Sequence, residues 1–151
     1  MKLNTKHFGS IEVNESEIIC FPEGILGFEN VKNYILLEKV EEEESPFKWL
    51  QGVEDTNLAF VLIDPRGIKP DYLVDVGESD VALLDIKDES KVFIYSVVVV
   101  PEDISKMTAN LKAPVLINTE TKKGKQIVLE KGDYPIRYCF LEELRRTGGT
   151  K

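Results

Sequence analysis

The chain has 151 residues, a length that fits one domain, and 42% of them are hydrophobic and 30% charged, which is enough apolar content for a packed core. Its 27 acidic residues outnumber the 19 basic ones and give a net charge of -8, which disfavours nucleic acid and favours basic protein partners. No N-terminal basic segment precedes a long apolar run, so we expect a cytoplasmic protein without a signal peptide or membrane span.

The sequence offers few groups for chemistry. His7 is the one histidine, and no nucleophile or carboxylate pattern accompanies it, so we expect a solvated surface side chain. Cys20 and Cys139 form neither a CxxC motif nor a cluster with histidine, and we expect both to be buried thiols. The sequence therefore predicts no catalytic residues, no metal and no cofactor, as in a binding protein.

The N-terminal half consists of short strand patterns separated by turn residues. The predicted strands are residues 2–6, 11–13, 18–21, 34–40, 47–52 and 58–63. Gly24 and Gly27 follow the third strand and stand among apolar residues. They predict a loop with special backbone angles and apolar anchors.

In the C-terminal half, residues 91–100 carry the strongest strand pattern, because β-branched and aromatic residues follow one another almost without interruption. We expect this strand to be buried on both faces. The other predictions are an extended segment at 72–76, a helix at 78–84, a hairpin of 114–118 and 126–130 with its turn at 122–124, a strand at 134–139 and a helix at 141–146.

This pattern determines the predicted fold class. About nine or ten short strands with one or two short helices are typical of a barrel or sandwich. We predict an all-β fold, a small antiparallel barrel or sandwich. Residues 1–140 are expected to form the β-barrel domain, and residues 141–151 a C-terminal helix or tail.

Four stretches together resemble the FliW family of flagellar assembly factors. They are FPEGILGFE at 21–29, PFKWLQ at 46–51, LAF at 58–60, and TANLKAPVLIN at 108–118 continuing to GKQ at 124–126. The resemblance extends from Met1 to about Tyr138. Gly52 departs from the pattern, since family members more often carry serine after the Leu-Gln pair.

The resemblance implies two protein partners in the cytoplasm. Proteins of this family bind flagellin and also the translational regulator CsrA, which itself binds RNA. The implied role is a partner switch: flagellin occupies the factor until it is exported, and the released factor then sequesters CsrA and relieves repression of flagellin translation. An acidic protein seated on a basic RNA-binding dimer would also repel RNA.

The glycine-shaped loop is the first candidate for a partner-binding surface. Its apolar residues Ile25, Leu26 and Phe28 are either inserted into the core or anchors for a partner. Trp49 is the one tryptophan, and strand alternation places it on the same face as Phe47. It is either a core residue or a partly exposed hot spot.

Polar residues complete the candidate list. Gln51 belongs to the same motif as Trp49, and Asn110 is either a structural residue beside Ala113-Pro114 or a partner contact. The acidic residues assigned to CsrA are Glu41, Glu42, Glu43, Glu54 and Asp55. Rim charges of this kind chiefly set association rate and salt dependence.

Two other function classes compete with this interpretation. A β-barrel can host a small-ligand or enzymatic site in its interior without a sequence signature, and a deep polar cavity would favour it. An oligonucleotide-binding barrel should show basic residues interleaved with exposed aromatics, whereas the basic residues here are scattered.

Overall fold

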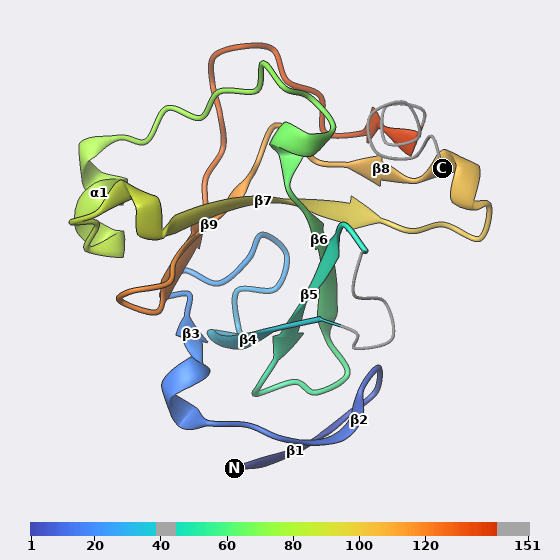
Figure 1. The fold of residues 1–151 in the computed structure, drawn as a ribbon, viewed down its shortest axis with the longest axis vertical. Coiled ribbons are helices and arrows are strands. Elements are labelled where there is room, and N and C mark those ends of the chain that lie inside the picture. The colour runs from blue at the N-terminus through green and yellow to red at the C-terminus, as the bar shows by residue number, and fades with distance from the viewer. Residues whose placement is uncertain (39–44, 142–151) are drawn as a thin grey trace.

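A closed barrel of seven strands forms the centre of the molecule (Figure 1). The computed structural model describes residues 1–38 and 45–141. The barrel strands are β3 (Ile19–Cys20), β4 (Asn33–Leu37), β5 (Phe47–Gly52), β6 (Ala59–Ile63), β7 (Val92–Val99), β9 (Val115–Asn118) and β10 (Lys123–Gln126). The order around the barrel is β7-β6-β5-β4-β3-β10-β9, and β9 pairs with β7 to close it. All these pairings are antiparallel except that of β3 with β10, which joins Cys20 to Lys123.

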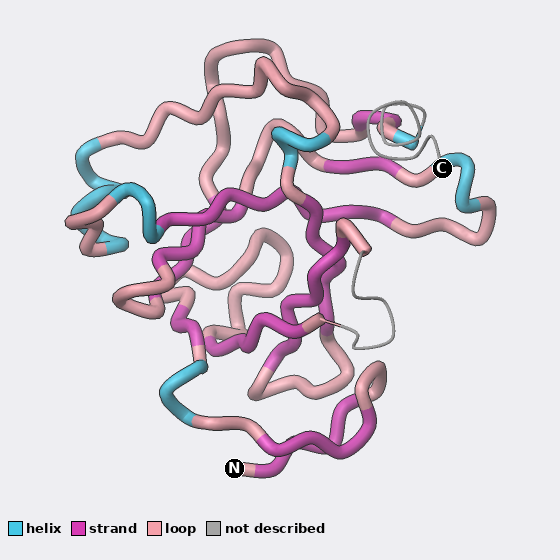
Figure 2. Tube along the Cα trace, viewed as in Figure 1, coloured by secondary structure: helices cyan, strands magenta, loops and turns pink. Residues whose placement is uncertain are grey.

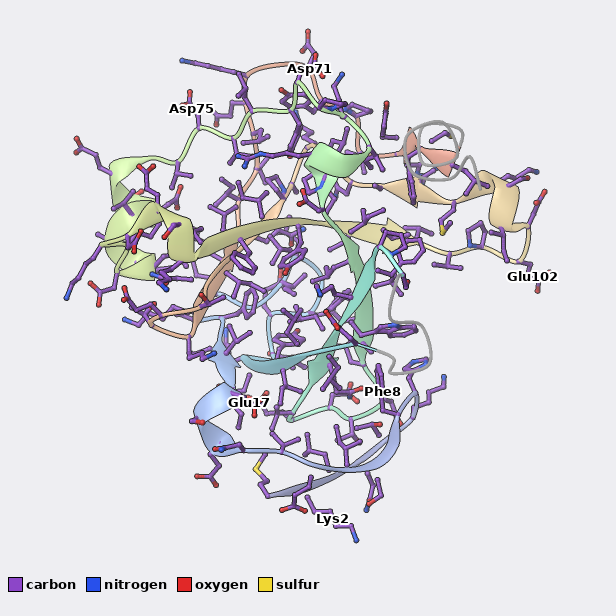
Figure 3. The ribbon with its side chains drawn as sticks, viewed as in Figure 1. Lys2, Phe8, Glu17, Asp71, Asp75 and Glu102 are labelled. Carbon is purple, nitrogen blue, oxygen red and sulfur yellow. The ribbon has the colours of Figure 1, made fainter. Side chains whose placement is uncertain are left out.

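Two further strand pairs are attached to this barrel. The hairpin of β1 (Lys2–Thr5) and β2 (Gly9–Glu12) covers one side of the wall, where Leu3 and Val13 pack on Ile35 of β4. β8 (Thr108–Ala109) pairs with the last residues of β7, and β11 (Tyr138–Cys139) pairs with β8. The labelled acidic side chains lie at the periphery (Figure 3).

Short helices connect the strands. Among the described elements, α1 (Glu78–Leu84) is an α-helix. The 3₁₀ turns among them are η1 (Glu15–Glu17), η3 (Pro65–Gly67), η4 (Glu89–Lys91) and η5 (Ile104–Lys106). Each 3₁₀ turn begins after an Asn or Asp whose side chain accepts a hydrogen bond from a backbone N–H of the turn, as N-cap residues do. No helix in the described part of the chain is long and apolar enough to cross a membrane.

Apolar side chains fill the barrel interior. Phe21, Tyr34, Leu50, Leu62 and Val115 are completely buried there and belong to one cluster. The Phe21 ring lies so close to β10 that a Cβ atom on Gly124 would approach ring atom Cζ to 2.4 Å. A glycine in the middle of β10 is therefore a packing requirement.

A second region, which we call the upper layer, lies over β7 and consists of residues 64–77 and 127–141. It contains few strands (Figure 2), yet Ile68, Tyr72 and Phe140 are as deeply buried as the barrel core. The Tyr72 hydroxyl donates to the backbone oxygen of Leu111 at 2.5 Å, and its ring lies 4.6 Å from that of Tyr134. Side chains thus anchor extended segments that no sheet holds.

The predicted all-β fold is confirmed, and the predicted bounds of β5 and α1 match those observed. The predicted hairpin is shifted, because its turn lies at 119–122 and its second strand at 123–126. Residues 72–76 form no strand, β8 was not anticipated, and 142–146 of the predicted C-terminal helix lie outside the described residues.

Two burial predictions are wrong. Phe93 and Val99 of β7 are exposed, because the run of β-branched residues reflects strand propensity in a barrel wall whose ends reach solvent. Cys20 and Cys139 are both exposed free thiols, since alternation along β3 turns Ile19 inward and Cys20 outward. His7 is exposed, as expected, and its ring lies 5.3 Å from that of Trp49.

Candidate partner-binding surface

The loop between β3 and β4 is held in a defined shape. Gly24 and Gly27 have φ angles of +68° and +89°, which side chains disfavour. A Cβ atom on Gly24 would also meet the Cα atom of Glu29 at 2.6 Å. The amide of Gly24 donates to Phe21 and that of Phe28 to Ile25, at 2.8 and 2.7 Å. Two successive tight turns therefore fix the direction of each side chain.

This shape separates the apolar residues of the loop into two groups. Ile25 is 2% exposed and packs in the barrel cluster, whereas Leu26 is 57% and Phe28 44% exposed. The Phe28 ring rests edge-on against Phe60 of β6, with centroids 5.2 Å apart. We call the exposed pair Leu26 and Phe28, with Phe60 beneath, the loop surface.

Strand β10 holds the loop from below. The Gln126 side chain accepts the amide hydrogen of Leu26 at 2.9 Å and donates to the backbone oxygen of Ala113 at 3.0 Å. The Nζ atom of Lys125 lies 2.5 Å from Oδ1 of Asp80 in α1 and 3.7 Å from Oε1 of Glu23. The hydrogen bond to Asp80 raises the pKa of Lys125. Two of the sequence stretches named above, 21–29 and 124–126, therefore meet in space.

Glu29 closes the loop from the other side. Its carboxylate accepts the amide hydrogen of Gly27 at 3.0 Å, and this hydrogen bond lowers the pKa of Glu29. The loop surface is therefore flanked by a group that stays ionised at neutral pH.

A groove of about 520 Å³ lies on the outer face of β5, β6 and β7. Trp49 and Phe47 line it together, as alternation predicted, with Val61, Val100 and Ile104. Trp49 is half-buried and lies edge-on to Phe8, with ring centroids 5.5 Å apart. Sequence reasoning missed Val100 and Ile104, whose exposure follows from the way the chain leaves β7 into η5.

Comparison with known proteins agrees with this architecture. The family model described as FliW protein matches residues 2–140. The chain belongs to the FliW family. Flagellar assembly factor FliW of Thermoanaerobacter pseudethanolicus is 47% identical over 145 residues, covering 96% of each chain, and that of Alkaliphilus metalliredigens is 49% identical, covering 97% of this chain and 90% of the relative. A crystal structure of the flagellar assembly factor FliW superposes with a TM-score of 0.85 at 36% identity, covering 93% of this chain and 96% of that one.

Several predicted contacts have a structural role within the FliW fold. Gln51 is completely buried, and its side chain donates to the backbone oxygens of Gly52, Thr56 and Leu58. Neither Gln51 nor Ile25 reaches the surface in this structure, and contact with a partner by either side chain stays a prediction. Asn110 is half-buried and accepts the amide hydrogens of Lys112 and Ala113, and its contact with a partner stays a prediction.

The acidic candidates divide into three cases. Glu54 accepts hydrogen bonds from both the amide and the side chain of Asn33, each at 2.9 Å. Desolvation works to raise its pKa, but these hydrogen bonds prevail and lower the pKa of Glu54. Asp55 is exposed, as Glu54 is, and its carboxylate accepts the amide hydrogen of Asn57 at 3.1 Å. The residues Glu41, Glu42 and Glu43 lie outside the described part of the chain.

Proposed function

We propose that this chain is a flagellar assembly factor that acts by binding flagellin and the translational regulator CsrA in the cytoplasm, releasing one as it takes the other. Family membership supports the flagellar role, and the resemblance described above supplies the two partners. Apolar side chains fill the barrel interior, which speaks against the alternative of a ligand-binding or enzymatic barrel.

The loop surface is the best candidate for the flagellin contact, and the exposure of Leu26 and Phe28 on a fixed backbone is the observation that carries this assignment. Apolar anchors on a preorganised loop lose little conformational entropy on binding. The gain from covering them is correspondingly large.

Titration calorimetry with flagellin from the same organism tests this contact. Phe28→Ala should weaken flagellin binding by roughly tenfold or more, as for an interface hot spot. Its effect on stability should be about 1 kcal/mol, since one edge-on aromatic contact is lost. The matched control is Ile136→Ala, which truncates an exposed apolar side chain elsewhere. Unchanged affinity in Phe28→Ala would exclude the loop surface.

The CsrA contact is assigned to acidic residues, and in the part of the chain that the structure describes both Glu54 and Asp55 are exposed. Asp55→Asn should slow association with CsrA, and the binding should weaken as salt rises. Salt-independent binding would contradict this assignment.

The switch itself requires that the two partners affect each other. Each titration is therefore repeated with the other partner already bound. Weaker binding in both orders supports the exchange, because linkage makes the coupling reciprocal. Unaffected binding in both orders would leave two partners but no switch.

A further inference from the structure

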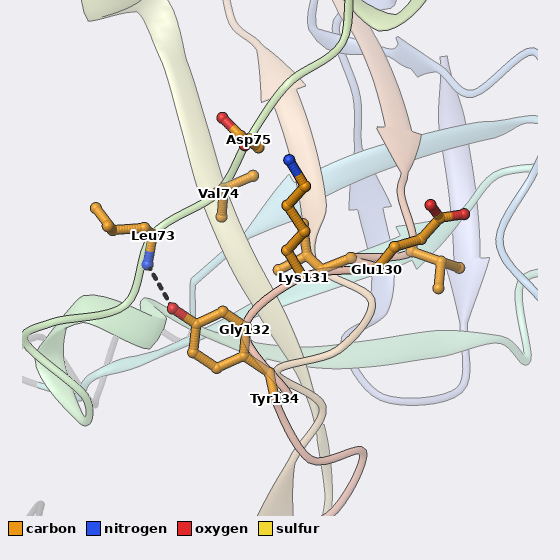
Figure 4. A pocket seen from close by; sticks show the side chains of 9 residues that line it. Leu73, Val74, Asp75, Glu130, Lys131, Gly132 and Tyr134 are labelled. Atoms are coloured by element: carbon orange, nitrogen blue, oxygen red, sulfur yellow. Dashed lines mark hydrogen bonds between the residues drawn. The ribbon is translucent and has the colours of Figure 1, made fainter.

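Two extended segments of the upper layer lie on either side of a cleft of about 530 Å³ (Figure 4). One bank is formed by residues 73–75, and the other by residues 128–132 together with Tyr134. Neither bank belongs to a strand (Figure 2). We call this feature the edge cleft.

One bank continues the line of β10 and has a free edge. The amide of Ile127 donates to Pro114 at 3.0 Å, and that of Leu129 donates to Lys112 at 2.7 Å. In an extended chain, neighbouring backbone amides point to opposite sides. The amides of Val128 and Glu130 therefore point away from residues 112–114, and they have no hydrogen-bond partner among the described residues.

The other bank shows the same arrangement. The amide of Leu73 donates to the Tyr134 hydroxyl at 3.0 Å, across the end of the cleft. By the same alternation, the amide of Asp75 points to this side. Within the described residues, no group accepts the amide hydrogens of Val74, Asp75 or Val76. Two unpaired backbone edges thus border one cleft.

Side chains around the cleft add apolar and acidic character. Leu73 is 75% and Val128 53% exposed, so apolar surface is available on both banks. Asp75 and Glu130 contribute two carboxylates against the single cation of Lys131. An occupant with apolar and basic side chains matches this lining.

We propose that the edge cleft binds an extended peptide segment of a partner protein by strand addition, with apolar side chains against Leu73 and Val128 and basic side chains near Asp75 and Glu130. Unpaired strand edges are templates for a further strand, in which main-chain hydrogen bonds supply affinity and alternate side chains supply specificity. The edge cleft shares no residue with the loop surface, so this binding site goes beyond the proposed function and is independent of it.

The test uses a synthetic peptide in which valine and lysine alternate, added to the ¹⁵N-labelled full-length protein and followed by amide chemical shifts. We expect shifts concentrated at residues 73–76 and 128–131. A peptide of the same sequence, N-methylated at alternate amides, keeps its side chains but loses the main-chain donors along one edge, which must face one bank of the cleft, and it should bind at least about tenfold more weakly. Equal binding of both peptides, shifts located only elsewhere, or no shift would overturn the proposal.

Charge is tested by a pair of protein variants. Val128→Lys places a cation in the edge cleft and should weaken binding of the basic peptide several-fold, whereas Val99→Lys, at an exposed apolar position outside the cleft, should not. An equal effect of both substitutions would show that the peptide responds to net charge alone, which would contradict binding in the cleft.

Discussion

The barrel interior and the upper layer bury tyrosines in different ways. Tyr34 in the barrel is completely buried between Phe21 and Phe60, and its hydroxyl finds no hydrogen-bond partner among the described residues. Tyr72 in the upper layer is buried equally, but its hydroxyl donates to Leu111. Desolvation raises the pKa of Tyr34 to about 12 and also raises that of Tyr72. In the barrel, where strand pairing orders the backbone, apolar packing holds Tyr34 in place without a hydrogen bond from its hydroxyl. In the upper layer, where strand pairing is sparse, the Tyr72 hydroxyl also ties two segments of backbone together.

The largest effect is expected in the barrel. Gly124→Ala would drive a methyl group into the Phe21 ring, which is completely buried and packed on the other residues of the barrel cluster. We expect the free energy of unfolding to fall by about 3 kcal/mol, at the upper end for overpacking. Urea denaturation of the native chain and the variant measures this difference in the free energy of unfolding. The control is Gly67→Ala, where an added Cβ would have no atom within 4 Å, and a similar loss there would refute the packing argument.

The upper layer should respond to the loss of one hydroxyl. Tyr72→Phe leaves the buried backbone oxygen of Leu111 without its donor, so we expect a loss of about 1–2 kcal/mol. Hydrogen exchange should show faster opening at residues 111 and 72 than in the barrel. Tyr134→Phe is the milder comparison, because its hydroxyl accepts from an exposed amide. A neutral Tyr72→Phe would remove the distinction between the two regions.

A smaller, pH-dependent effect is expected at Glu54, which bonds to the start of β4. Hydrogen bonds lower its pKa in the folded state, so its stabilisation is present above the unfolded value of about 4.3 and is lost as pH falls through the folded pKa. The stability advantage of the native chain over Glu54→Gln should therefore shrink on acidification from neutral pH. Thermal melts at several pH values measure it, with Glu102→Gln as the exposed control. A constant difference would contradict the assignment.

The smallest effect is expected for Tyr34→Phe. Removing a hydroxyl that lacks a partner costs no hydrogen bond and relieves its desolvation. We expect thermal stability to be unchanged or slightly increased, in contrast to the same substitution at Tyr72. A clear decrease would indicate that the Tyr34 hydroxyl is hydrogen-bonded in solution.

The sequence predicted those elements whose local pattern agrees with their tertiary surroundings. The bounds of β5 and α1 are examples. The hairpin failed because Gly124, which looks like a turn residue, is required by the Phe21 ring a hundred positions away. In the observed turn, Lys122 has a φ of 58°. Positive φ is uncommon for residues other than glycine, so a lysine gives no sequence signal for this turn.

The candidate site was predictable to the same limited extent. Gly24 and Gly27 identified a shaped loop, but which apolar residues face outward depends on contacts with β6 and β10. Gln51 looked like a surface contact because a single sequence does not reveal which backbone groups a polar side chain will satisfy.

The parallel pairing of Cys20 with Lys123 also bears on synthesis of the protein. β3 emerges early from the ribosome and β10 late. The barrel of a nascent chain therefore stays open between β3 and β9 until nearly all of the domain has been translated. Its unpaired edges remain open to association with other chains during that time. Strand β10 (residues 123–126) completes the barrel by pairing with β3 and β9. A chain truncated before β10 should therefore aggregate even though most of its core residues are present.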